Sequence, residues 1–121
     1  MIHFDYWEFR CNCNGCLLSG ESMDSDFLRM LDTARAVANV PFRITSGLRC
    51  EAYNATLEHA KPTSSHLTGH AADIATPDSK TRFAVLQGLH MAGFTRMGVA
   101  ETFIHCDNDK KKDAAVCWLY G

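Results

Sequence analysis

The chain has 121 residues, of which 46% are apolar and 21% are charged, and its formal net charge is −2. This length suffices for one domain with a buried core, and the balanced charge argues against a nucleic-acid surface. Lys110–Lys112 form the one cationic run and are interpreted as a solvated turn. No segment reaches the roughly 18 consecutive apolar residues of a membrane span, and residues 1–8 lack the basic and apolar regions of a signal peptide.

The first part of the chain is predicted to be an arm and a loop, followed by a long helix. Residues 2–10 are aromatic and are expected to pack on the domain, whereas residues 11–22 form a loop rich in Cys, Asn, Gly and Ser. Apolar side chains recur at helical spacing over residues 24–39, which predicts an amphipathic helix. Ser22 or Asp24 is a suitable capping residue at its start.

The remaining segments alternate between short strands and helices. Strands are expected at 42–45, 70–75, 94–99, 102–107 and 115–120, and helices at 51–60 and from a cap at Ser79 to Gly93. This order predicts an α+β fold: one small domain over residues 1–121, with an antiparallel sheet and two main helices. Within it, residues 1–20 are the arm and loop and residues 21–121 are the core.

Six cysteines are many for a chain of this length. Cys11, Cys13 and Cys16 form a C-x-C-x-x-C cluster that could join Cys50 in a four-thiolate structural zinc site. This is not the usual paired C-x-x-C spacing, so disulfides and free thiols remain open.

Two further cysteines lie in the last predicted strands. Cys106 and Cys117 are expected either to be cross-strand neighbours or to pack as small apolar side chains.

A split pattern supplies three candidate metal ligands. Its first part runs from Ser64 to Asp73, with the sequence SSHLTGHAAD, and its second part is Phe103-Ile104-His105-Cys106-Asp107. His66, Asp73 and His105 offer two imidazoles and one carboxylate, a set that binds Zn²⁺ and leaves one position open for water. Such an ion activates water and polarises a carbonyl group. Gly69 permits an unusual backbone angle or a close approach to the metal.

A hydrolase also needs a group that stabilises negative charge and a group that accepts a proton. Arg49 follows a predicted strand end, where its guanidinium could hold a substrate carboxylate or the oxyanion. Glu101 and Asp107 lie near His105 in the sequence and are the candidate general bases.

The three motifs Ser-Gly-x-Arg, Ser-x-His-x-x-Gly-x-Ala-x-Asp and Phe-Ile-His-x-Asp resemble those of D-alanyl-D-alanine carboxypeptidases and related zinc peptidases. That family includes vancomycin-resistance dipeptidases, murein endopeptidases and phage endolysins, and the resemblance covers roughly residues 20–120. It implies that His66, Asp73 and His105 bind zinc, that Arg49 holds substrate, and that Ser64 lies beside the site.

The chain departs from the family pattern at one position. The better-known members carry an acid three residues before the last histidine, where this chain has Thr102. The base would then be Glu101, Asp107 or absent. Hedgehog signalling domains share the same zinc fold, and their Ile-His-Cys segment is similar to Ile104–Cys106. Those domains are binding proteins without an established peptidase role.

Two functions follow as expectations from this resemblance. The first is a zinc peptidase that cuts peptidoglycan stem or cross-link peptides next to a D-amino acid, encoded by a phage. It would be a monomer, made in the cytoplasm and acting on the cell wall after release or as part of a virion, without nucleic-acid or membrane partners. The alternative is a non-catalytic zinc-binding or virion structural module.

Overall fold

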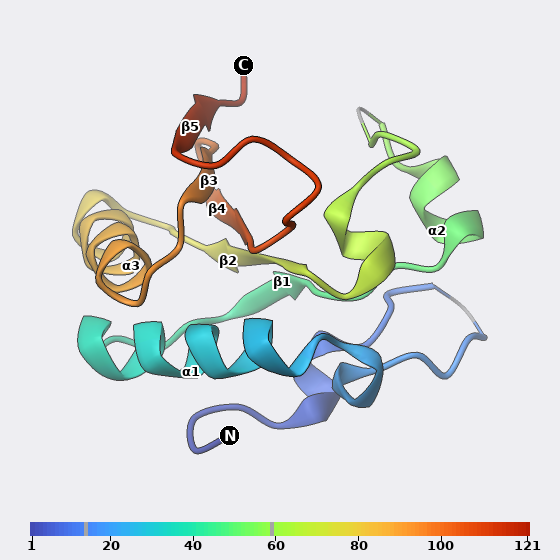
Figure 1. Cartoon of the computed structure of the whole chain (residues 1–121), viewed down its shortest axis with the longest axis horizontal. Helices are drawn as coiled ribbons and strands as arrows, with labels where there is room; N and C mark the ends of the chain where they lie inside the picture. The colour runs from blue at the N-terminus through green and yellow to red at the C-terminus, as the bar shows by residue number, and fades with distance from the viewer. Residues whose placement is uncertain (14, 59) are drawn as a thin grey trace.

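The computed structural model describes residues 1–13, 15–58 and 60–121, and its centre is a five-stranded sheet (Figure 1). The strands lie in the order β1-β2-β4-β3-β5. Their bounds are β1 Ile44–Ser46, β2 Ala71–Ala75, β3 Arg96–Val99, β4 Phe103–Asp107 and β5 Val116–Leu119. The first four strands pair antiparallel, whereas β5 pairs parallel with β3. The sheet is therefore antiparallel as predicted except at this one edge.

Three α-helices and three short 3-10 segments surround this sheet in the described part of the chain. They are α1 Ser25–Ala38, α2 Glu51–Thr56, α3 Ser79–Met91, η1 Tyr6–Phe9, η2 Gly20–Ser22 and η3 Ser65–Thr68. The Asp24 carboxylate caps α1 by accepting a hydrogen bond from the Phe27 N–H at 2.9 Å, and Asn39 ends the helix in a left-handed conformation. None of the described helices has the length and apolar character needed to cross a bilayer.

One face of the sheet is buried under α1 and α3, the two long helices. Phe27 and Leu31 of α1 and Leu89 of α3 belong to the same apolar core as Ile74 and Ile104 of the sheet. Burial of such side chains contributes about 1.5–3 kcal/mol each. The predicted α+β fold with two main helices is confirmed.

The register of β2 and β4 determines which side chains reach the opposite face. Ile74 is paired with Ile104 in the core, and the neighbouring pair is Asp73 and His105. Because successive side chains of a strand point to opposite faces, Asp73 and His105 lie together on the face that the long helices leave uncovered.

Several boundaries differ from the sequence-based expectations. The helix expected over 51–60 is α2, which ends at Thr56, and residue 59 lies outside the described residues, as does residue 14 of the expected loop. Asp78 rather than Ser79 caps α3, because its carboxylate accepts a hydrogen bond from Thr81 N–H at 2.7 Å. Asp78 is one residue further out, where the capping carboxylate can reach that N–H group.

The expectation that Cys106 and Cys117 are cross-strand neighbours is wrong. Strand β3 lies between β4 and β5, and Met97 is in register with Cys106 on one side and with Cys117 on the other. The order of these three strands depends on the loop after β4, which carries the chain past β3 to the edge of the sheet. The packing alternative is confirmed for Cys106, which is fully buried in the apolar core, and is wrong for Cys117, which is exposed at the edge strand β5.

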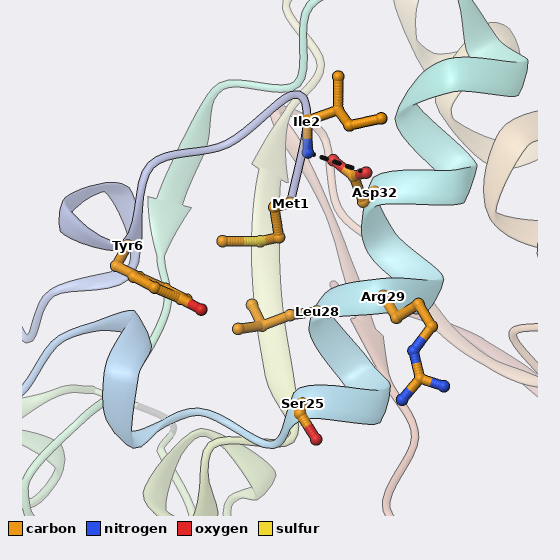
Figure 2. Close-up of a pocket in the computed structure, with 7 residues that line it drawn as sticks. All are labelled: Met1, Ile2, Tyr6, Ser25, Leu28, Arg29 and Asp32. Atoms are coloured by element: carbon orange, nitrogen blue, oxygen red, sulfur yellow. Dashed lines mark hydrogen bonds between the residues drawn. The ribbon is translucent and has the colours of Figure 1, made fainter.

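The N-terminal arm packs on the domain as predicted, and the structure shows that it does so against α1. The Asp32 carboxylate accepts hydrogen bonds from Ile2 N–H at 3.2 Å and His3 N–H at 2.8 Å. Figure 2 shows Met1, Ile2 and Tyr6 of the arm around a hollow whose other wall is formed by α1 residues, including Leu28 and Asp32. This hollow lies on the helical side of the molecule.

Candidate metal centre

Three donor side chains converge on the uncovered face of the sheet. His66 comes from η3, Asp73 from β2 and His105 from β4, and one ligand atom of each lies within 4.8 Å of the others. All three side chains are buried. The structure thus brings together the three residues that the sequence analysis selected as metal ligands.

A short turn fixes the backbone that carries His66. The Ser64 hydroxyl accepts a hydrogen bond from His66 N–H at 3.3 Å, and Gly69 ends the turn with a φ of 76°. A Cβ atom on Gly69 would lie 2.9 Å from the Cα of Met23. The expectation of an unusual backbone angle at Gly69 is confirmed, whereas the close approach is to the segment before α1 and not to the ligands.

The tautomer of His66 follows from its hydrogen bonds. Its Nδ1 lies 2.7 Å from the carbonyl oxygen of Gly47, which can only accept, so Nδ1 carries the proton. Its Nε2 then presents a lone pair to the Oδ1 of Asp73 at 3.3 Å. Burial lowers the pKa of His66, which favours the neutral, ligating form of the ring.

The second imidazole is held by two carboxylates. His105 Nε2 lies 2.8 Å from Asp107 Oδ2, and His105 Nδ1 lies 3.0 Å from Asp73 Oδ1. Burial alone would lower the pKa of His105, but hydrogen bonds to Asp107 and Asp73 raise it overall. Burial would raise the pKa of Asp73, yet its contacts with the His105 and His66 rings hold it well below its usual range, so Asp73 is an anion at neutral pH.

The donor set fits a divalent cation and zinc in particular. His66 Nε2 presents a lone pair to the anionic Asp73 Oδ1, and His105 Nδ1 faces the same oxygen. A lone pair and an anionic oxygen repel each other unless a cation lies between them. Zinc binds imidazole nitrogen and carboxylate oxygen at roughly 2.0–2.2 Å, which places tetrahedral ligands about 3.4 Å apart. The observed N–O separations of 3.0 and 3.3 Å are close to this value.

Asp107 lies behind His105, and three groups contact its carboxylate. Its Oδ1 accepts from Arg96 Nε at 2.7 Å and from Asp109 N–H at 3.2 Å, while Oδ2 faces His105. Burial raises the pKa of Asp107, but His105, the Asp109 N–H and Arg96 together lower it more, so the net shift is downward. This carboxylate orients the ring and raises its basicity, which is the role of a group outside the metal's own ligands.

Glu101 lies elsewhere, at the turn between β3 and β4. Its side chain is exposed, and its carbonyl oxygen accepts a hydrogen bond from Arg82. It precedes His105 by four positions, up to about 13 Å of extended chain. Thr102 is also exposed at this turn. Of the two acids proposed as the base, the structure couples Asp107 to the ligands and leaves Glu101 at the end of the strand.

Arg49 lies on the other side of Asp73. Its Nη2 is 3.4 Å from Asp73 Oδ2, its Nε is 3.1 Å from the hydroxyl of Ser46, and its Nη1 is 3.3 Å from Asn54 Oδ1. A guanidinium has five N–H donors. Three of these N–H groups point at the three partners. Among the described residues no further acceptor is seen for the other two N–H groups, which can therefore donate to a substrate. Arg49 thus holds the outer oxygen of the central carboxylate.

Sequence reasoning missed an aromatic wall beside the ligands. The Trp118 ring lies 5.5 Å from the His105 ring, and Tyr120 packs against both Trp118 and Phe103. Gly98 gives them space, because a Cβ atom there would lie 2.4 Å from Trp118 Nε1. The alternation of Trp118 and Tyr120 along the last strand was the available signal, but the position of that strand depends on its pairing with β3.

A second hollow in the surface lies next to η3 and the loop after β4. Ser64, Leu67 and Asp107 are among its lining residues, together with the segment around Lys110–Lys112. The three ligands themselves do not line it. Ser64 therefore both caps the turn that carries His66 and faces this hollow.

Comparison with known proteins supports a relationship over most of the chain. The family model described as Peptidase M15 matches residues 2–107. The crystal structure of the Serratia marcescens L-Ala D-Glu endopeptidase ChiX is similar at 25% sequence identity and a TM-score of 0.47, over 61% of this chain and 67% of that chain. No curated protein sequence matches significantly. The family match includes all three candidate ligands, whereas Trp118 and Tyr120 lie beyond it.

Proposed function

The chain belongs to the peptidase M15 family, and from this premise we propose that it is a zinc-dependent peptidase acting on peptidoglycan. The bond cut lies next to a D-amino acid of a stem or cross-link peptide. His66, Asp73 and His105 are the proposed ligands. A phage origin and a role in host lysis or wall penetration remain predictions from the sequence.

The observation that carries this proposal is the geometry of the three donors. His66 Nε2 and His105 Nδ1 both face Asp73 Oδ1 at distances suited to one zinc ion. Three protein ligands leave the fourth tetrahedral position free, which distinguishes a catalytic from a closed structural site. When bound there, zinc supplies Lewis-acid polarisation of the carbonyl group and activation of water.

The neighbouring residues have separate roles in this proposal. Asp107 orients His105 through Oδ2 and contacts Arg96 through Oδ1, so we assign it a positioning role, with one lone pair of Oδ2 left for a proton. Arg49 has two N–H groups left to donate to the oxyanion or to a substrate carboxylate. Glu101 and Asp107 are the proposed proton acceptors, and of these two Asp107 is the one that contacts His105.

The substrate peptide would lie between Arg49 and the aromatic wall. Trp118 and Tyr120 offer apolar surface beside His105, and burial raises the pKa of Tyr120, so its hydroxyl remains a hydrogen-bond donor at neutral pH. Ser64 at the rim of the second hollow offers a further polar contact.

Digestion of purified peptidoglycan tests the proposal. Wild type with zinc should release new amino termini, and mass spectrometry of the fragments identifies the bond and separates carboxypeptidase from endopeptidase activity. His66→Ala should abolish release, whereas His90→Ala, which alters an exposed histidine of α3, should retain it. Absence of any cleavage by folded, zinc-loaded wild type would contradict the proposal and support the non-catalytic zinc module.

A further inference from the structure

A second group of metal-binding side chains lies at the junction of the N-terminal arm and α2. Cys11, Cys13 and Cys16 come from the loop between η1 and η2, and Cys50 is the residue that precedes α2. The four sulfur atoms all lie within 4.8 Å of one another. Cys11 is buried and the other three are half-buried.

The spacing of these sulfur atoms fits one tetrahedral ion. Zinc binds thiolate sulfur at about 2.3 Å, so four tetrahedral sulfur ligands lie about 3.8 Å from one another. A disulfide requires a sulfur pair at roughly 2.05 Å, and all four cysteines are free in this structure. Two disulfides would need only two close pairs, whereas here every sulfur is near the other three.

Backbone N–H groups point at the sulfur atoms, which is the second observation. Cys50 N–H donates to Cys11 Sγ at 3.4 Å, and Tyr53 N–H donates to Cys50 Sγ at 3.4 Å. A neutral thiol is a weak acceptor, whereas a metal-bound thiolate carries charge and gains from such donors outside the coordination shell. Four thiolates around a divalent ion have a net charge of −2, which these N–H groups partly offset.

From this geometry we propose that Cys11, Cys13, Cys16 and Cys50 form a second, structural zinc site that attaches the arm to the segment carrying Arg49. All four positions of the ion would be filled by protein, so it would hold the fold without taking part in hydrolysis. These four residues are the Cys site.

The proposed ion would hold the N-terminal arm against the segment 47–49, which precedes Cys50. Leu48 N–H donates to the Phe9 carbonyl at 2.9 Å, and a Cβ atom on Gly47 would lie 2.7 Å from Phe9 backbone atoms, so arm and segment are in close contact. The Gly47 carbonyl orients His66, and Arg49 N–H donates to the His66 carbonyl. An ion at the Cys site would therefore stabilise the backbone that supports the candidate metal centre.

Metal content provides the first test. Wild type purified under reducing conditions without chelator should contain two zinc equivalents. The double variant Cys13→Ser/Cys16→Ser and the variant His66→Ala should each contain one, and the control Cys117→Ser, which alters an exposed cysteine of β5, should contain two. A single equivalent in wild type that only His66→Ala removes would overturn the proposal.

Cobalt substitution provides a test that does not require a cysteine variant to fold. Cobalt-loaded wild type and His66→Ala should both show the intense near-ultraviolet sulfur-to-cobalt charge-transfer band. Its absence from both proteins, or two disulfides among these four cysteines in freshly isolated protein, would overturn the proposal. Neither readout depends on catalysis, so a protein with two zinc ions and no peptidase activity would contradict the proposed function and leave the Cys site intact.

Discussion

The two metal-binding clusters of this chain differ in ligand number, ligand type and position. The candidate metal centre has two imidazoles and one carboxylate, all buried, and two of them project from adjacent strands of the sheet. The Cys site has four thiols from a loop and the start of a short helix. Three ligands, two on strands and one on the η3 turn, leave a position for water, whereas four thiolates fill every position of the ion and link the loop after the arm to the start of α2.

The difference suggests that the two sites serve different purposes in this small domain: the candidate metal centre serves catalysis and the Cys site serves stability. The sheet already holds Asp73 and His105 in register through backbone hydrogen bonds, so an ion there adds little to the definition of the fold. The arm contributes Phe4 and Phe9 to the core but adds no strand to the sheet. An ion at the Cys site would link the loop after this arm to the start of α2, and its binding would contribute to the folding free energy.

The largest effects are expected from variants that remove a ligand of either cluster: one variant should lose activity and the other should lose stability. His66→Ala should reduce peptidase activity by more than about 10³-fold, because water activation and carbonyl polarisation are lost together. Cys13→Ser/Cys16→Ser should instead lower the Tm by more than about 10 °C, since metal binding contributes to folding free energy. Activity assays and thermal unfolding of both variants provide the comparison. Equal losses of activity and stability in both would contradict the separation.

The next effect concerns the two acids near His105. Asp107→Asn should reduce metal affinity or kcat/KM by about 10–100-fold, because the ring loses its charged partner. Glu101→Gln is the matched control and should change kcat/KM by less than about twofold, because its side chain is exposed at the strand end. Steady-state kinetics and competition with a zinc indicator measure both quantities. A loss of several orders of magnitude in Glu101→Gln would identify it as the base instead.

A smaller effect is expected at Arg49. Arg49→Lys keeps the charge but loses the planar fork that donates to Asp73, Ser46 and Asn54. We expect kcat/KM to fall about tenfold, or about 1.4 kcal/mol, with zinc content unchanged at both sites. Kinetics combined with metal analysis checks this. Loss of a zinc equivalent would show that Arg49 acts by holding the ligand Asp73 more than by contacting substrate.

The smallest effect lies outside both clusters, at the cap of α1. Burial raises the pKa of Asp24, but the Phe27 N–H and the Asn108 amide lower it more, so its net pKa shift is downward. The charge therefore stabilises the fold above the unfolded-state pKa of about 4, and this contribution is lost as pH falls through the lowered folded value. Asp24→Asn, which keeps an acceptor oxygen, should cost about 0.5–1 kcal/mol at pH 7.

Denaturant unfolding of wild type and Asp24→Asn at matched pH values from 7 to 3 measures this difference. The gap in unfolding free energy should be constant down to about pH 5 and narrow below about pH 4. A gap that widens on acidification would contradict the assigned direction of the pKa shift.

Local sequence patterns predicted those parts of the fold that depend on residues close together in the sequence. The long helix α1 follows from apolar side chains at helical spacing, and the three candidate ligands follow from a motif in which a turn leads directly into a strand. Gly69 was identified because its positive φ is a local requirement.

Features that depend on tertiary pairing were not predictable in the same way. The parallel pairing of β5 with β3 sets Trp118 beside His105 and separates Cys117 from Cys106, and no local pattern specifies it. Similarly, Asp107 was selected for its distance from His105 along the chain, but its engagement by Arg96 depends on the pairing of β3 with β4.

Zinc reconstitution is the most direct test of the central claim that the three-ligand centre performs the chemistry. Zinc would be titrated into metal-depleted wild type while peptidoglycan cleavage and bound metal are measured together. The account predicts no cleavage without metal and full cleavage once the His66 centre is filled, with His66→Ala inactive at every zinc concentration. Full cleavage by the metal-free protein, or restored cleavage in His66→Ala, would contradict it.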